Sequence, residues 1–184
     1  MDSNKFISQN KYYDFKDVLI VPQPSSINSR KDVCLTRHIE FANGLSWEGI
    51  PIFAANMTTV GTFDVYKVLS THKIITAFHK FYKLKDFIEY NKNNTEPLNP
   101  DYFAVSTGIS DNDFNNLVNI LDNFDCKWIM IDIANGYINN FKEFCKKVRQ
   151  KYSRKIIIAG NVTTQQGVHD LIECGVDIVK VGIG

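Results

Sequence analysis

From residue 50 to the end of the chain, short apolar runs alternate with segments whose apolar residues recur at helical spacing. The six apolar runs read PIFAAN, IITAFHK, DYFAVSTG, WIMID, KIIIAGN and VDIVKVGIG. Continuous apolar runs are typical of strands buried on both faces of a parallel sheet, and helices between such strands imply right-handed crossovers. The chain is therefore predicted to be an α/β protein with six parallel strands and five intervening helices.

The first 49 residues do not share this alternation. They contain Pro22, Pro24, several Ser and Asn residues, and one short apolar run at residues 18–21. We predict an irregular arm over residues 1–49, which packs on the barrel or on a neighbouring subunit, because a featureless leader of this length is rare in a compact domain. Residues 50–184 would then form a partial (β/α) barrel with strands 1 to 6, since a closed barrel needs eight strands.

The composition argues against several classes of partner. The chain has 184 residues, 44% of them hydrophobic, and a net charge of +1. This balance gives no broad electrostatic footprint for nucleic acid or an anionic membrane, and no apolar run approaches the ~20 residues that span a bilayer. The first residues lack the apolar core of a signal peptide, and the four cysteines contain no CxxC pair. We therefore expect a cytoplasmic protein with reduced thiols, no zinc site, and neither a nucleic-acid nor a membrane partner.

Polar residues follow several of the predicted strands, among them Asn56, His79, Lys80 and Asp132. The carboxyl ends of parallel strands meet on one rim, where α/β proteins bind their ligands. Asp132 is the leading candidate because it ends the run WIMID directly before a turn. The residues alone leave a structural alternative open, in which Asp132 caps the next helix and Lys80 is a solvated surface lysine.

Eight segments follow the order of one known family from Tyr13 to Gly184. They read YDFKDVLIVP, SINSR, IPIFAANMTTVGTF, TAFHKFY, VSTGISDNDF, IDIANGY, AGNVTT and DIVKVGIG. These segments closely resemble the IMP dehydrogenase/GMP reductase family and, within it, the GMP reductases. The resemblance implies a (β/α)8 TIM barrel, here truncated to about six strands. It also implies NADPH-dependent reductive deamination of GMP to IMP and ammonia, through a covalent thioimidate on a cysteine, in a homotetramer.

The resemblance assigns site residues by matching motifs. It implies that Lys80 and Asp132 are catalytic and lie beside the reacting carbon and the nicotinamide. The carboxylate could accept a hydrogen bond from the cofactor or from leaving ammonia. The residues that would bind NADPH are Ser29, Arg30, Lys80, Asp132, Ile133, Ala134, Ile183 and Gly184. Ser29 and Arg30 match a pair that reaches the cofactor from a neighbouring subunit, and an Arg suits the extra phosphate of NADPH. Gly184 would also offer its backbone carbonyl to K⁺.

The sequence departs from the family in three respects. The family's catalytic cysteine lies a few residues beyond the position of Gly184, and none of the four cysteines here matches it, so we expect the chain to be inactive alone. Thr58 stands where relatives commonly carry an Asp. Val21, Gln23 and Pro24 stand where relatives commonly carry basic residues.

Two alternatives stay open. The first is an IMP dehydrogenase-like oxidoreductase, although that enzyme usually has an insertion where residues 79–82 lead straight into a helix here. Its fourth strand also usually ends in a serine-rich sequence, where this chain has Asp132. The second alternative is a non-catalytic truncated protein that binds a nucleotide or joins a full-length partner's oligomer, because an unclosed barrel leaves two open sheet edges.

Overall fold

The computed structural model describes Tyr13 and residues 15–182, apart from the Phe15 side chain. The chain divides into two compact units, Met1–Cys34 and Leu35–Gly184. The described part of the first unit contains two short 3-10 helices, η2 (Phe15–Asp17) and η3 (Arg30–Asp32). The second unit contains the sheets and the α-helices. No helix among the described residues is long and apolar enough to cross a membrane.

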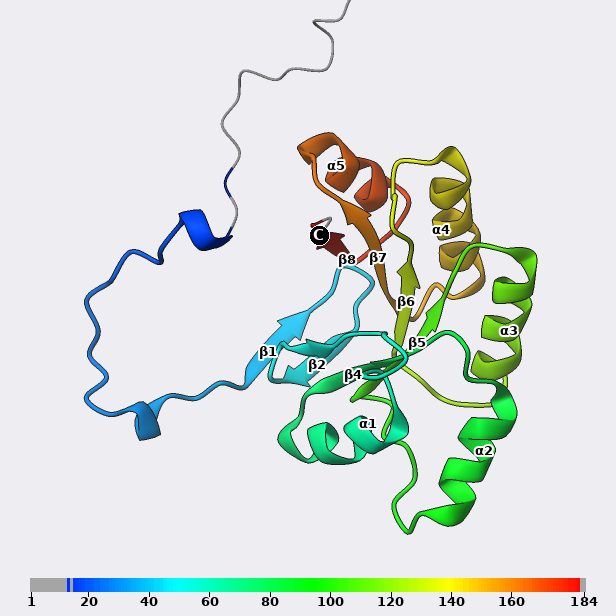
Figure 1. The fold of residues 1–184 in the computed structure, drawn as a ribbon, viewed down its shortest axis with the longest axis horizontal. Coiled ribbons are helices and arrows are strands. Elements are labelled where there is room, and N and C mark those ends of the chain that lie inside the picture. Colours follow the sequence, from blue (N-terminus) through cyan, green and yellow to red (C-terminus); the bar gives the residue numbers. More distant parts are fainter. Residues whose placement is uncertain (1–12, 14, 183–184) are drawn as a thin grey trace, which may run out of the picture. The chain divides into compact units, whose positions relative to one another are not determined.

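Six parallel strands and five helices alternate in the second unit, which confirms the predicted α/β order (Figure 1). The strands pair in chain order and are β3 (Phe53–Ala54), β4 (Ile75–Phe78), β5 (Phe103–Thr107), β6 (Trp128–Asp132), β7 (Ile156–Val162) and β8 (Ile178–Val181). The helices are α1 (Phe63–Leu69) with the 3-10 turn η4 (Ser70–His72), α2 (Leu84–Asn93), α3 (Asp111–Leu121), α4 (Asn139–Lys151) and α5 (Gln165–Glu173). Figure 1 shows the helices around the outside of a curled sheet. The arrangement is a TIM-type barrel truncated to six strands.

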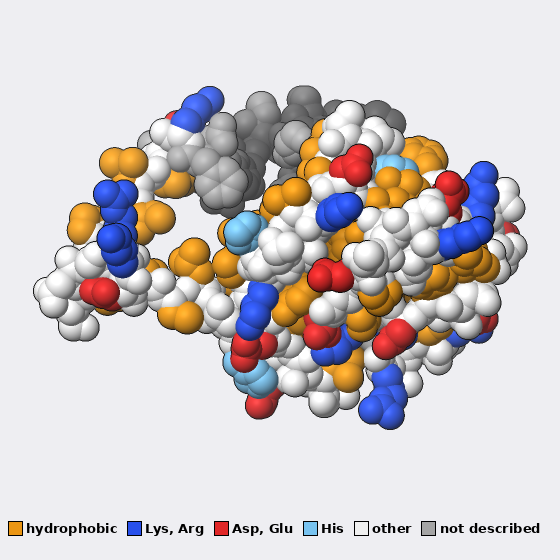
Figure 2. All heavy atoms as spheres, turned by 90° about the horizontal axis from the view of Figure 1, so that it is seen from below, with side chains coloured by type: hydrophobic (Ala, Val, Ile, Leu, Met, Phe, Trp, Pro, Cys, Tyr) orange, Lys and Arg blue, Asp and Glu red, His pale blue; other side chains and the backbone are white. Residues whose placement is uncertain are grey.

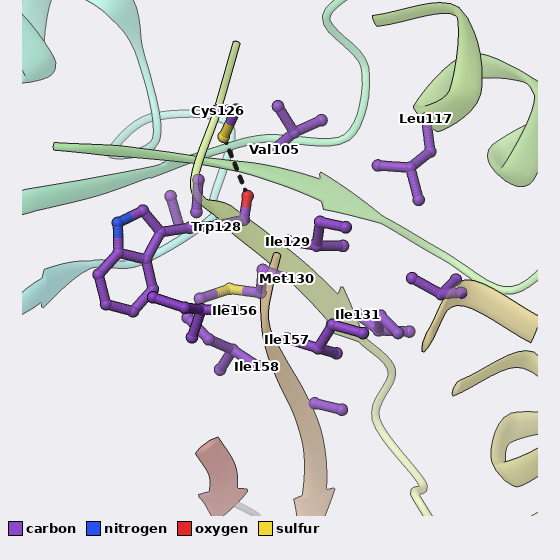
Figure 3. Close-up of a cluster of buried hydrophobic side chains, with 14 of the residues drawn as sticks. Val105, Leu117, Cys126, Trp128, Ile129, Met130, Ile131, Ile156, Ile157 and Ile158 are labelled. Carbon is purple, nitrogen blue, oxygen red and sulfur yellow. Dashed lines mark hydrogen bonds between the residues drawn. The ribbon is translucent and has the colours of Figure 1, made fainter. Parts of the chain in front are cut away.

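Side chains alternate between the two faces of this sheet, as a strand requires. Figure 3 shows Trp128 and Met130 of β6 on one side, together with Ile156 and Ile158 of β7. Ile129 lies on the other side, toward the helices. Because the register pairs Trp128 with Ile156 and Met130 with Ile158, the first side forms the continuous lining of the barrel.

Side-chain caps start several helices directly after the strand exits. Ser110 and Asp113 form a reciprocal capping box at the start of α3, in which each side chain accepts a hydrogen bond from the other's backbone amide at 3.1 Å. Thr62 and Thr164 cap α1 and α5 with their hydroxyl groups. Such caps satisfy backbone amides that have no partner within the helix. These caps define the residue at which each loop after a strand ends and the next helix begins.

Residues 37–49 differ from the irregular arm that the sequence predicts over residues 1–49. β1 (Arg37–Glu40) and β2 (Ser46–Gly49) form an antiparallel hairpin within the second compact unit. In β2, Trp47 and Gly49 are buried, while Ser46 and Glu48 are exposed. This alternation covers only four residues, which is too short to stand out as a strand in the sequence. The predicted packing of the arm on the barrel or on another subunit stays a prediction for residues 1–34.

The hairpin packs on an aromatic cluster at the amino-terminal end of β6. The Trp128 ring meets Phe41, Trp47 and Phe53 edge-on, with ring centroids 5.5 to 5.7 Å apart. The indole N–H groups of Trp47 and Trp128 both donate to the carbonyl oxygen of Asp101, at 2.9 and 3.0 Å. Edge-to-face aromatic pairs are stabilising beyond the area that they bury. This cluster lies at the amino-terminal end of β6, opposite the end at which the strand exits.

Tyr137 joins two loops at the carboxyl ends of the strands. Its phenol oxygen accepts hydrogen bonds from the backbone amides of Thr163 and Thr164, at 2.7 and 2.9 Å. The same oxygen lies 3.2 and 3.1 Å from their side-chain hydroxyls. The hydroxyls, helped by the amides, lower the pKa of Tyr137 to about 8. The loop after β6 is thereby anchored to the loop after β7.

Replacing Trp128 tests the aromatic cluster. Trp128→Ala should lower the free energy of unfolding by about 3–5 kcal/mol, because it removes a fully buried ring and leaves a cavity. Equilibrium denaturant unfolding measures this loss. Ile88→Ala, at a side chain that is 51% exposed on α2, should change stability by no more than about 0.5 kcal/mol. Equal effects of the two substitutions would contradict the proposed role of the cluster.

The Tyr137 phenol should ionise at about pH 8, whereas tyrosine in an unfolded chain ionises near pH 10. Because the folded pKa is the lower one, ionisation adds stability only as the pH rises from about 8 to about 10. A spectroscopic titration of tyrosinate absorbance should show a step near pH 8 in the wild-type protein. That step should vanish in Tyr137→Phe, and an unchanged titration curve in the variant would refute the assignment.

Candidate functional site

The structure places the candidate rim residues at the carboxyl ends of the strands. Asp132 is the last residue of β6, and His79 and Lys80 follow β4 directly. Asn56 lies two residues beyond β3, and Asn161 lies near the end of β7. The strand exits therefore fall where the apolar runs of the sequence end, and they meet at one mouth of the partial barrel.

Asp132 is held by two hydrogen-bond donors from opposite edges of the sheet. Asn56 Nδ2 donates to Asp132 Oδ2 at 3.0 Å. Lys180 Nζ, from β8, donates to Asp132 Oδ1 and forms an ion pair with it. The side chains of Asp132 and Lys180 are 30% and 28% exposed. A carboxylate has about four acceptor positions, so both oxygens can still accept a further hydrogen bond from a ligand.

Lys180 is a site residue that the sequence analysis did not select. In the sequence, Lys180 stands out only as the single lysine inside the last apolar run, VDIVKVGIG. A lysine inside a buried barrel strand is costly unless it is paired, and that cost could have drawn attention to it. Its partner could not be read from the sequence, because 48 residues separate Lys180 from Asp132.

Lys80 lies at the same mouth but has other neighbours. Its side chain is exposed, and its ammonium group lies 5.7 Å from the centroid of the Phe81 ring. A Cβ added to Gly108, just after β5, would lie 3.2 Å from Lys80 Nζ. Among the described residues, no ion pair links Lys80 to Asp132. The cation next to Asp132 is Lys180.

The remaining predicted cofactor residues fall into three groups. Ile133 and Ala134 follow Asp132 in the loop after β6, where Ile133 exchanges backbone hydrogen bonds of 2.9 Å with Gly160 and Asn161 and Ala134 is exposed. Ser29 and Arg30 are exposed in the first unit, and the Ser29 hydroxyl caps η3 by accepting from Lys31 N at 3.2 Å. The third group is Ile183 and Gly184, which lie outside the described residues.

Three buried polar atoms near the mouth have no hydrogen-bond partner among the described residues. They are His79 Nδ1, Ser106 Oγ and Asn161 Oδ1. The register pairs Ser106 with Met130, which precedes Asp132 by two residues on β6. Ser106 therefore faces the barrel lining, on the same side of the sheet as Asp132. The His79 ring stacks on Tyr82, with ring centroids 3.9 Å apart. Buried polar atoms without partners are uncommon in native structures, and a polar ligand at this mouth could satisfy them.

Burial lowers the nucleophilic reactivity of three of the four cysteines. Cys126 and Cys145 are fully buried, and burial raises the pKa of each thiol to about 12. Burial also raises the pKa of Cys174. Because the thiolate is the nucleophile, these thiols are poor nucleophiles at neutral pH. Cys34 is exposed but belongs to the first unit. No group of three His, Cys, Asp or Glu that could hold a metal ion occurs in the described part of the chain.

Charge is mixed over the surface seen in Figure 2. Lys and Arg side chains lie among Asp and Glu side chains on the face that it draws. Some charged side chains of the described residues are paired between neighbouring elements, such as Lys155 with Asp125 at 3.1 Å and Lys73 with Glu48 at 2.9 Å. At the mouth, the ion pair is that of Lys180 with Asp132.

Comparison with known proteins gives a consistent result. A family model for the IMP dehydrogenase / GMP reductase domain matches residues 12–184. GMP reductase 2 of Homo sapiens is 45% identical over 173 residues, which cover 93% of this chain and 49% of the human protein. GMP reductase of Klebsiella pneumoniae subsp. pneumoniae is 44% identical over 180 residues, which cover 97% of this chain and 52% of that protein.

The fold has a solved counterpart as well. The crystal structure of inosine 5′ monophosphate dehydrogenase from Legionella pneumophila superposes with a TM-score of 0.76 at 27% sequence identity. That superposition covers 92% of this chain and 50% of the other one. The chain thus spans about half the length of the curated relatives that it matches. On the family match, the sequence identities and the shared fold, this chain belongs to the IMP dehydrogenase / GMP reductase family.

Proposed function

We propose that this chain is part of a GMP reductase, an enzyme that uses NADPH to convert GMP to IMP and ammonia. The observation that carries the proposal is the identity of 44–45% to GMP reductases from a mammal and a bacterium over more than nine-tenths of the chain. The mouth of the partial barrel supports it, because Asp132 stands there with spare acceptor positions.

The proposal gives Asp132 and Lys80 the catalytic roles. Asp132 would accept a hydrogen bond from the leaving ammonia or from the nicotinamide end of the cofactor. Lys80 is exposed beside Gly108 and so has room to approach a bound ligand. Burial makes Cys126, Cys145 and Cys174 poor candidates for the attacking nucleophile. Cys34 is exposed but does not match the position of the family's catalytic cysteine, so the proposal assigns that thiol to a segment outside these 184 residues.

NADPH fits the polar character of the mouth. The unpartnered atoms His79 Nδ1 and Asn161 Oδ1 could bind polar groups of the cofactor, and Ile133 and Ala134 would border it. When bound, NADPH supplies the hydride for the reduction. Ser29 and Arg30 would reach the cofactor of a neighbouring subunit, since both are exposed. The proposal includes K⁺ at the Gly184 carbonyl, a homotetramer and a cytoplasmic location, all of which rest on the resemblance.

An IMP dehydrogenase-like activity is the second candidate. It is favoured by the superposition on the dehydrogenase from Legionella pneumophila. The two reactions differ in their nucleotide and in the direction of hydride transfer, so a pair of assays separates them. A non-catalytic protein that binds a nucleotide or joins a longer partner is the third, and it predicts no turnover in either direction.

The protein from its native source should oxidise NADPH when GMP is added and should release ammonia. Loss of the absorbance of reduced nicotinamide measures the rate, and chromatography identifies IMP as the product. IMP with NAD⁺ serves as the comparison reaction. Faster turnover of IMP with NAD⁺ would favour the dehydrogenase reading, while inactivity in both assays would favour the non-catalytic one.

Asp132→Asn should lower kcat for GMP reduction by about 100-fold or more, because the neutral amide removes the negative charge and one of the two acceptor oxygens that would meet the leaving ammonia or the cofactor. Asp170→Asn is the matched control, since Asp170 is also a partly exposed carboxylate paired with a lysine, Lys142, but it lies on α5. The control should keep the wild-type kcat. Retention of full activity in Asp132→Asn would remove Asp132 from the catalytic machinery.

A further inference from the structure

Asp132, Gly160 and Lys180 form a single row across three adjacent strands. The register pairs Asp132 of β6 with Gly160 of β7, and Gly160 with Lys180 of β8. Neighbouring strands lie about 4.8 Å apart, so the backbones of Asp132 and Lys180 are roughly 10 Å apart. Directly paired residues direct their side chains to the same face of a sheet. The lysine therefore reaches the aspartate across the intervening strand.

Gly160 leaves the space that this crossing needs. A Cβ added to Gly160 would lie 2.6 Å from Lys180 Cβ and 2.5 Å from the Lys180 carbonyl oxygen. Real Cβ atoms essentially never come so close to other heavy atoms. Any larger residue would therefore displace Lys180 or separate β7 from β8 at this point. The absence of a side chain in the middle of the row is what brings the charges at its two ends together.

The carboxylate at the end of this row is fixed from two sides. Lys180 holds Oδ1 and Asn56 holds Oδ2, so rotation of the carboxylate would break at least one hydrogen bond. Asn56 comes from the exit of β3 and Lys180 from β8, the first and last strands of the sheet. Both contacts that hold the carboxylate come from the chain itself. Such preorganisation is what a hydrogen-bond acceptor in an active site requires.

We propose that Lys180 is a positioning residue, which holds the Asp132 carboxylate in its reactive orientation across Gly160. The role rests on the proposed function, because Asp132 is the residue that would touch the substrate or the cofactor. Lys180 itself acts only through Asp132. Removing its charge should therefore reduce the rate of the chemical step more than it reduces nucleotide binding.

A second ion pair in the same chain provides a matched control. Lys142 on α4 pairs with Asp170 on α5, and these side chains are 31% and 22% exposed, similar to the 28% and 30% of Lys180 and Asp132. Lys142→Met and Lys180→Met thus remove the same charge from similar surroundings. The two pairs differ in position, because only Lys180 holds a residue at the mouth of the barrel.

The test compares the kinetics of Lys180→Met, Lys180→Arg and Lys142→Met in the NADPH-oxidation assay with the full enzyme. We expect Lys180→Met to lower kcat by roughly 10-fold to 100-fold, with a smaller change in the KM for GMP. Lys180→Arg should recover most of the loss, because it restores a cation that can donate to Oδ1. Lys142→Met should keep the wild-type kcat. An unchanged kcat in Lys180→Met, or an equal loss in Lys142→Met, would overturn the inference.

Nuclear magnetic resonance of the lysine ammonium groups tests the contact without relying on turnover. Asp132→Asn should shift the Lys180 ammonium signal and leave the Lys142 signal in place, while Asp170→Asn should do the reverse. If the Lys180 ammonium signal does not shift in Asp132→Asn, the inference is overturned even in an active enzyme. If the wild-type protein shows no turnover, the proposed function and the positioning role are both overturned. In that case the ammonium signal still shows whether Lys180 contacts Asp132.

Discussion

Successive side chains of a strand point to opposite faces, so β6 directs Trp128, Met130 and Asp132 into the barrel and Ile129 and Ile131 toward the helices. The inward set changes from aromatic to apolar to charged along the strand. Its first member anchors the aromatic cluster, and its last member stands at the mouth. The same two-residue period therefore builds the core at one end of β6 and places a carboxylate at the other.

A carboxylate at this position needs partners, because apolar side chains line the barrel directly beneath it. Met130 and Ile158 form the pair of the lining below the Asp132–Gly160 pair. Burying a charge without compensation is costly, and the cost falls when the charge is paired and hydrogen-bonded. Lys180 and Asn56 provide that compensation and leave acceptor positions for a ligand. Compensation of the Asp132 charge therefore leaves the carboxylate able to accept further hydrogen bonds.

The sequence predicts the sheet better than it predicts the contacts of the site. The runs from PIFAAN to VDIVKVGIG mark all six strands of the described sheet. The four central strands, β4 to β7, are apolar because they are buried on both faces, and the half-buried edge strands β3 and β8 continue the same apolar pattern. The sequence does not predict the hairpin at residues 37–49, because its alternating apolar pattern is too short to indicate a strand. The sequence does not predict that Lys180 pairs with Asp132, because this pairing depends on strand register. A slip of one residue would turn Lys180 to the helix side, and local sequence does not reveal such a slip.

Each residue in the Asp132–Gly160–Lys180 row is a poor choice for a buried strand on its own. Glycine weakens a strand, and Asp and Lys are depleted from strands. Together they are consistent, because the glycine leaves room for the lysine and the lysine compensates the aspartate. Local rules of strand composition are expected to fail where function requires it. Here they fail on three neighbouring strands in one row, where the three residues compensate one another.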